Sequence, residues 1–197
     1  MEHTEASAAD LPSDADIAAL SRALDRPIVL VGLMGVGKST IGRRLASVLS
    51  VPFLDADDEV VEAAQMSIPE IFDHYGEAYF RDGERRVIAR LIDETHGGGA
   101  VIATGGGAFI ESETRALILD KAIAVWLDGD LDTLVERVSR KKTRPLLIGK
   151  DPREVLSDLM AVRNPLYAEA HVRVASEAGP QMQAIARILN ALQEHLA

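Results

Sequence analysis

The stretch VGLMGVGKST has the clearest chemical meaning in this chain. In it, Gly32, Gly37, Lys38 and Ser39 follow the order G-x-x-x-x-G-K-[ST], the pattern of a loop that holds phosphate groups. Glycines let the backbone curl around phosphate oxygens, and the start of the next helix adds partial positive charge. We expect Lys38 to reach the β- and γ-phosphates and the Ser39 hydroxyl to bind Mg²⁺. The motif predicts a bound nucleotide and leaves the use of that nucleotide open.

A second candidate group is the acidic run LDADDE. If the strand before it continues to Asp57, then Asp55 and Asp57 share one face. One carboxylate would hold the water shell of a metal, and the other would orient an attacking hydroxyl and accept its proton. Asp58 and Glu59 are expected to face solvent at a helix start. The alternative is that all four acids only cap a helix. The neighbouring phosphate loop favours a functional role over capping.

Three arginines are candidates for binding an anion. Arg81 shares a helix face with Glu77 and Glu84 because of their spacing, so a surface ion pair is the alternative. Arg144 lies in KTRPLL, which we interpret as a flap, and Arg163 lies in RNPLY.

The glycine run GGGA is a candidate of another kind. At Gly106 a ligand would touch backbone without obstruction by a side chain.

Strand and helix patterns alternate along the chain and would position these groups. We expect strands at 27–31, 51–57, 99–104, 122–129 and 171–175, and helices at 38–50, 77–94, 131–140, 153–170 and 180–197. Ser67 and Glu70 form a capping box at another helix start. This alternation predicts a parallel sheet covered by helices on both faces. Ligands of such sheets bind at the carboxyl ends of the strands, where the candidate loops fall.

Composition narrows the function classes. The 197 residues are 47% hydrophobic and contain no cysteine, so we expect a single soluble domain without disulfides or thiolate metal sites. No secretory signal, transit peptide or membrane span is expected, which makes the cytoplasm the default location. The net charge of -10 argues against nucleic-acid binding, and an anionic substrate would need locally clustered arginines.

The first 26 residues differ from the rest, with six acidic and two basic side chains. We interpret residues 1–26 as an acidic, partly disordered extension that aids solubility. Within it, we expect residues 1–13 to be mobile and residues 14–25 to form a short helix.

Six motifs in order make the chain resemble the shikimate kinases, a family related in fold to nucleoside monophosphate kinases. They are GLMGVGKSTIGRRLA, FLDADDEV, SIPEIFDHYGEAYFRDGE, ATGGGA, TRPLL and RNPLY, and the resemblance covers residues 27–195. It implies a three-layer α/β P-loop kinase fold with a five-stranded parallel sheet. It also implies a substrate-binding segment at about 55–95 and a lid at about 141–153, within one domain at 27–197.

The resemblance implies transfer of the γ-phosphoryl group of ATP to the 3-hydroxyl of shikimate, giving shikimate 3-phosphate and ADP on the pathway to aromatic amino acids. The implied catalytic residues are Asp57 as the base, Lys38 and the lid residue Arg144. The implied nucleotide-binding residues are Gly35, Val36, Gly37, Lys38, Ser39, Thr40, Arg137 and Arg144. The implied substrate-binding residues are Asp57, Arg81, Glu84, Gly105, Gly106, Gly107 and Arg163. Ser39 and, through water, Asp55 would hold Mg²⁺.

Two departures from the family pattern stand out. Gln65 occupies a position where many relatives have glycine. The segment 176–180, expected to pack on adenine, lacks an arginine that some relatives have, which leaves the choice of ATP over GTP open.

Two other functions remain open from the residues alone. One is a P-loop kinase with a different acceptor, either gluconate or a nucleoside monophosphate; the 4% aromatic content disfavours a nucleotide acceptor. The other is a nucleotide switch or an inactive binding module. We expect ATP and shikimate as partners, no nucleic acid, no membrane, and a monomer.

Overall fold

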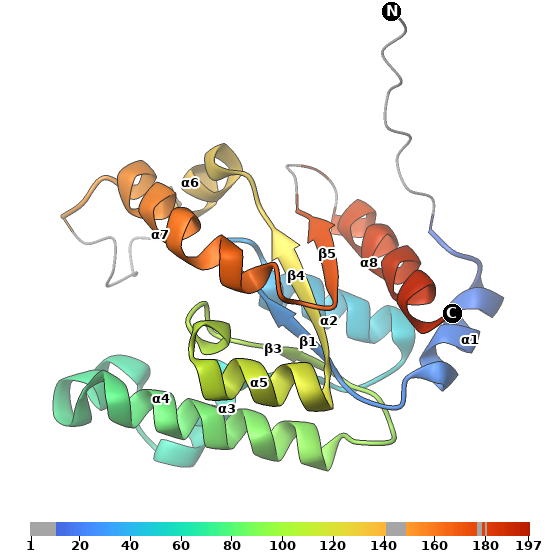
Figure 1. Ribbon diagram of the computed structural model, residues 1–197, viewed down its shortest axis with the longest axis horizontal. Coiled ribbons are helices and arrows are strands. Elements are labelled where there is room, and N and C mark those ends of the chain that lie inside the picture. Colours follow the sequence, from blue (N-terminus) through green and yellow to red (C-terminus); the bar gives the residue numbers. More distant parts are fainter. Residues whose placement is uncertain (1–10, 141–148, 177–178, 180) are drawn as a thin grey trace, which may run out of the picture.

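Five parallel strands form a single sheet in the computed structural model, which describes residues 11–140, 149–176, 179 and 181–197. The order across the sheet is β2-β3-β1-β4-β5 (Figure 1). The strands are β1 (Ile28–Val31), β2 (Phe53–Asp55), β3 (Val101–Ala103), β4 (Ile123–Asp128) and β5 (Val172–Ala175). The predicted five-stranded parallel sheet is confirmed.

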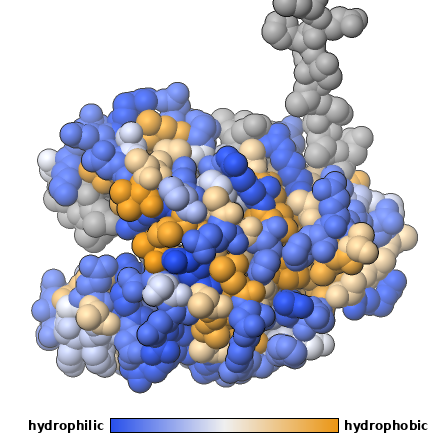
Figure 2. Space-filling view, in the orientation of Figure 1, coloured by the Kyte–Doolittle hydropathy of each residue, from blue (hydrophilic) through white to orange (hydrophobic). Residues whose placement is uncertain are grey.

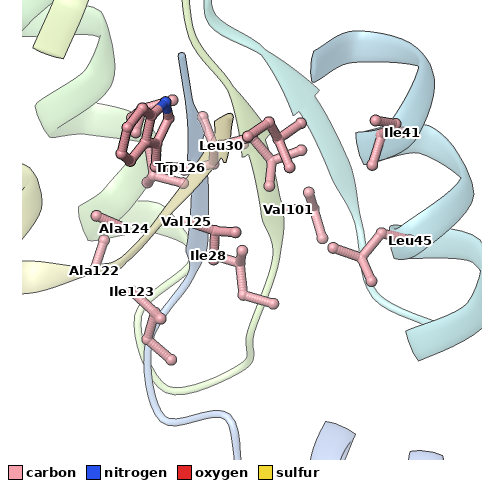
Figure 3. Close-up of a cluster of buried hydrophobic side chains, with 14 of the residues drawn as sticks. Ile28, Leu30, Ile41, Leu45, Val101, Ala122, Ile123, Ala124, Val125 and Trp126 are labelled. Atoms are coloured by element: carbon pink, nitrogen blue, oxygen red, sulfur yellow. The ribbon is translucent and has the colours of Figure 1, made fainter. Parts of the chain in front are cut away.

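The central strand β1 is buried along its whole length, as its run of β-branched and aliphatic residues predicts. Ile28 pairs with Val101 on one side and with Ile123 on the other. Figure 3 shows Ile28 and Val101 on the side of the sheet that faces Ile41 and Leu45 of the following helix. The phosphate loop therefore follows a strand that is buried and paired on both sides.

Helices cover both faces of the sheet. On one face α2 (Lys38–Leu49) packs on β2 and β3, with α1 (Asp14–Ala23) and α8 (Gln181–Leu196) beside it. On the other face α5 (Ser112–Lys121) packs on β4 and against α4 (Ile68–Glu94) (Figure 1). The remaining elements are α3 (Ala56–Ala64), the 3₁₀ turn η1 (Ala108–Ile110), α6 (Leu131–Ser139) and α7 (Pro152–Tyr167). This is the predicted three-layer arrangement.

Helix α1 is present as predicted, and it is packed against the core. Ile17 and Leu20 are buried, and the Ser21 hydroxyl donates a 2.7 Å hydrogen bond to the carbonyl of Leu49. The first ten residues lie outside the described part of the chain, so their predicted mobility stays a prediction.

The structure corrects the predicted end of the second strand. Strand β2 stops at Asp55, and Asp57 lies in the first turn of α3, so the two carboxylates do not share a strand face. The physical reason is helix capping, because the Asp55 carboxylate accepts a 3.1 Å hydrogen bond from the Asp57 amide. Asp58 and Glu59 complete an acidic first turn, as predicted for a helix start.

The predicted capping box is also present. Ser67 and Glu70 exchange side chain to backbone hydrogen bonds at the start of α4, and this long helix is kinked at Gly76. Helix α5 and the turn η1 were not predicted. Among the described helices, none has both the length and the apolar composition needed to cross a membrane.

Candidate active site

The phosphate loop between β1 and α2 has a backbone that requires glycine. Gly32 has φ 135°, and a Cβ there would lie 2.6 Å from the carbonyl oxygen of Leu127 on β4. Gly37 has φ 98° and caps α2. Lys38 follows at the helix start, where its buried ammonium donates hydrogen bonds of 2.7 and 3.0 Å to the carbonyls of Gly32 and Leu33. The loop is thus closed around its own lysine.

A cavity of about 520 Å³ opens beside this loop. Ten of the predicted site residues line it: Gly35, Val36, Gly37, Lys38, Ser39, Thr40, Asp57, Gly105, Gly106 and Arg137. The Arg137 guanidinium also donates a 3.1 Å hydrogen bond to the carbonyl of Val36, which ties α6 to the loop. Figure 2 shows the surface hollowed between the α6–α7 part of the molecule and the α4 part.

Some residues that line the cavity were not predicted from the sequence. Thr104, Arg140, Gln183 and Arg187 line it, the last two from α8. Arg140 and Arg187 carried no motif, but Thr104 immediately precedes the glycine run and was detectable by its position.

Asp57 lines this cavity and is partly buried. Burial raises the pKa of its carboxyl above the ordinary value of 3.8, and the nearby Asp55 adds to this, while Lys38 and Arg81 oppose it. A carboxylate with a raised pKa is a better proton acceptor than one in water. Asp55 itself is occupied in capping α3, and it is not among the residues that line the cavity.

Arg81 and Glu84 form an ion pair on α4 beside the glycine run. The Arg81 guanidinium donates a 2.7 Å hydrogen bond to Glu84 Oε2, and the Glu84 side chain is only 2% exposed. Burial raises the pKa of Glu84, and the charge of Arg81 opposes this. Glu77 makes a longer contact of 3.3 Å with Arg81, so the predicted shared face is confirmed.

Two glycines of the run lie against these charged groups. A Cβ at Gly105 would be 2.8 Å from both Asp57 Oδ1 and Glu84 Oε1, and a Cβ at Gly107 would be 2.5 Å from the Arg81 guanidinium. Any larger residue would displace them. The glycines therefore let a carboxylate pair and a guanidinium approach the backbone.

Arg163 reaches the same segment from α7. Its guanidinium donates a 3.0 Å hydrogen bond to the carbonyl of Gly106. The structure thus gathers Asp57, Arg81 and Arg163 around residues 105–107, at the edge of the phosphate-loop cavity. Arg144 and most of the predicted lid lie outside the described residues, so their roles stay predictions.

A phosphate loop at the centre of a parallel sheet, beside a cavity that gathers a carboxyl group and two guanidinium groups, is the arrangement of a P-loop kinase of small molecules. The family model for shikimate kinase matches residues 34–193. The chain belongs to the shikimate kinase family, and it is an ATP-dependent phosphotransferase of the shikimate pathway.

Individual relatives agree with this assignment. A shikimate kinase of Novosphingobium aromaticivorans is 54% identical over 197 residues, which cover all of both chains. One of Caulobacter vibrioides is 59% identical over 169 residues, covering 86% of this chain and 83% of that one. A solved shikimate kinase of Acinetobacter baumannii in complex with shikimate is 36% identical, with a TM-score of 0.80 over 88% of this chain and 97% of that chain.

Proposed function

We propose that this chain transfers the γ-phosphoryl group of ATP to the 3-hydroxyl of shikimate at the boundary between the cavity and the glycine run. The observation that carries the proposal is the convergence of Asp57, Arg81 and Arg163 on residues 105–107. All of these groups come from one chain, which supports a monomer as the working unit.

The substrate's charge explains the two arginines. The chain carries a net charge of -10, so its overall field repels a carboxylate. Arg81 and Arg163 present planar guanidinium forks, which match the two oxygens of a carboxylate. With the carboxylate held by these arginines at Gly106 and Gly107, the acid's hydroxyls would extend toward Asp57, which lies against Gly105.

Asp57 acts on the hydroxyl that attacks. Its raised pKa lets it accept the hydroxyl proton as the bond to phosphorus forms. In a loose transition state the protein mainly positions the reactants and stabilises charge. Asp57 aligns the nucleophile, while Lys38 and the amides of the loop hold the phosphates that leave with ADP.

Mg²⁺ suits the oxygen groups at this end of the site. Ser39 is exposed at the first turn of α2 and lines the cavity, and Asp55 lies two residues before Asp57 at the end of β2. Hydroxyl and carboxylate oxygens are hard ligands, and Mg²⁺ typically takes few of them beside phosphates and water. Ser39 would bind the ion directly and Asp55 through water, and the bound ion neutralises phosphate charge.

The test is an ADP-release assay with ATP, Mg²⁺ and one acceptor at a time: shikimate, gluconate or AMP. We expect ADP release that depends on shikimate, together with a phosphorylated acid of matching amount. Equal turnover with gluconate would contradict the acceptor assignment. ADP release that no acceptor stimulates would instead favour a nucleotide switch.

A further inference from the structure

Tyr167 is a buried polar group in the site that the mechanism above does not use. It is the last residue of α7, its side chain is 1% exposed, and its hydroxyl donates a 2.5 Å hydrogen bond to the carbonyl of Gly106. It lies four residues after Arg163, so the two share a face of the helix. Both side chains therefore meet the glycine run at the same oxygen.

Aromatic neighbours fix the position of this hydroxyl. The Tyr167 ring stacks on Phe109 with centroids 6.2 Å apart and on Trp126 with centroids 6.1 Å apart. Phe109 belongs to η1, directly after the glycine run, and Trp126 belongs to β4. The ring is thus held by η1 and by β4 of the sheet, and its hydroxyl is placed by contacts other than the glycine that it binds.

Residues 105–107 need such an external constraint. Three consecutive glycines have more backbone freedom than any other three residues. The carbonyl of Gly106 and the amide of Gly107 belong to one peptide plane, so a donor on that carbonyl sets the orientation of both. Gly107 in turn lies against the Arg81 guanidinium.

We propose that Tyr167 is a positioning residue for the acid substrate, whose hydroxyl orients the Gly106–Gly107 peptide and the Arg163 guanidinium. The proposal rests on the proposed function of this site. Among the described residues, the hydrogen bond and ring contacts of Tyr167 go to Gly106, Phe109 and Trp126, and not to Lys38 or Asp57. We therefore expect its loss to affect acid binding more than ATP binding.

The hydroxyl stays a donor throughout the working pH range. Burial raises the pKa of Tyr167 to about 12, while the charge and hydrogen bonding of Arg163 oppose this rise. The hydrogen bond to Gly106 is therefore not lost by ionisation near neutral pH.

The test is Tyr167→Phe in the full chain. Loss of one hydrogen bond should raise the Kd for shikimate, measured by calorimetry, and the KM for shikimate by about 3–10-fold. We expect kcat and the KM for ATP to change less than about twofold, because the ring and the phosphate loop are untouched. The emission of Trp126, the single tryptophan, should stay as in the parent if the stack is intact.

Tyr79→Phe is the matched control, because that tyrosine is 52% exposed on α4 and its ring stacks on Tyr75. Shikimate affinity in Tyr167→Phe within twofold of the parent would overturn the proposal while leaving the proposed function standing. A parallel loss of ATP affinity and thermal stability would overturn it in favour of a structural role. A parent chain that fails to bind shikimate at all would overturn the proposed function first, and this inference with it.

Discussion

At the scale of single residues, the carboxyl group of Asp57, the proposed base, has a raised pKa that lowers the stability of the fold at neutral pH. Its position in the first turn of α3, beside Asp55 and within the site, raises its pKa because the charged form loses solvation and meets a like charge. The folded chain therefore binds a proton at Asp57 more readily than the unfolded chain does. At neutral pH the ionised carboxylate destabilises the fold, and this effect diminishes as the pH falls through the raised pKa toward 3.8.

Asp57→Asn should separate these two effects. We expect kcat with shikimate to fall by about 10²–10⁴-fold, because the amide cannot accept the proton. At pH 7 the free energy of unfolding should rise by about 0.5–2 kcal/mol. That gain should shrink below the folded pKa, where the parent's Asp57 is itself protonated. Steady-state kinetics and urea unfolding at several pH values measure both quantities.

Asp58→Asn is the control for this substitution, since the Asp58 side chain is 77% exposed and only 3.8 Å from Arg43 in a surface ion pair. Its kcat should match the parent's. Near-normal turnover in Asp57→Asn would remove Asp57 from the role of base.

Arg81 is predicted to bind the acid through its fork. Arg81→Lys keeps the positive charge beside buried Glu84 but replaces two planar donors with one point charge. The KM for shikimate should rise by about 10–100-fold, in line with the loss of a charge-assisted hydrogen bond, while the KM for ATP stays unchanged.

Arg85→Lys provides a comparison one turn along α4, where Arg85 pairs with Asp82 and Glu113 at the surface. Its kinetics should equal the parent's. A rise in the KM for ATP in Arg81→Lys, as large as that for shikimate, would contradict the assignment of Arg81 to the acid.

At the scale of elements, the end of α3 contains a strained residue. Gln65 has φ 52° and ψ 30°, a left-handed conformation that glycine adopts without the steric cost of a Cβ. Its side chain donates a 2.7 Å hydrogen bond to the carbonyl of Glu62, which offsets part of that cost at an exposed position. A glutamine is thus accommodated locally at this position and leaves the helix end in place.

Gln65→Gly should stabilise the fold by about 0.5–1 kcal/mol, because relief of the left-handed strain exceeds the loss of one exposed hydrogen bond. Gln65→Ala is the matched control, since it loses the same hydrogen bond and keeps the strain, and it should destabilise. Urea unfolding compares the three chains. A Gly variant no more stable than the Ala variant would show that the turn is not strained. Turnover should be the same in all three chains.

The elements also show how far the sequence leads. Buried runs such as residues 28–31 and helix periodicity are local signals, so the strands, α2 and the capping box at Ser67 were predictable. The end of β2 was not predictable, because the sequence at Asp57 is compatible with both a strand and a helix start. The hydrogen bond from the Asp57 amide to the Asp55 carboxylate, which starts the helix, is visible only in the structure. Tyr167 was missed for another reason. Its role depends on Gly106, far away in sequence, and a buried tyrosine usually signals only packing.

At the scale of the whole molecule, α1 is part of the helical layer on one face of the sheet. The acidic composition of residues 1–26 had instead suggested that this segment stands apart from the domain. It precedes residue 27, where the acidic composition ends, yet it packs on both α2 and α8. Ile17, Leu20 and Leu24 are buried in the same core as the strands that carry the phosphate loop. The acidic residues of this helix lie on its exposed face. The overall composition of the segment therefore did not reveal that the opposite face is buried.

Leu20→Ala tests whether this helix is part of the cooperative core. Leu20 is 4% exposed, so truncating it leaves a cavity between α1 and its neighbours. We expect the free energy of unfolding from urea titration to fall by about 2–5 kcal/mol in one transition. Leu11→Ala, at a leucine that is 44% exposed, should change it by less than about 0.5 kcal/mol. A detached α1 would instead give Leu20→Ala the same unfolding midpoint as the parent, since losing a contact that fluctuates independently of the sheet does not shift global unfolding.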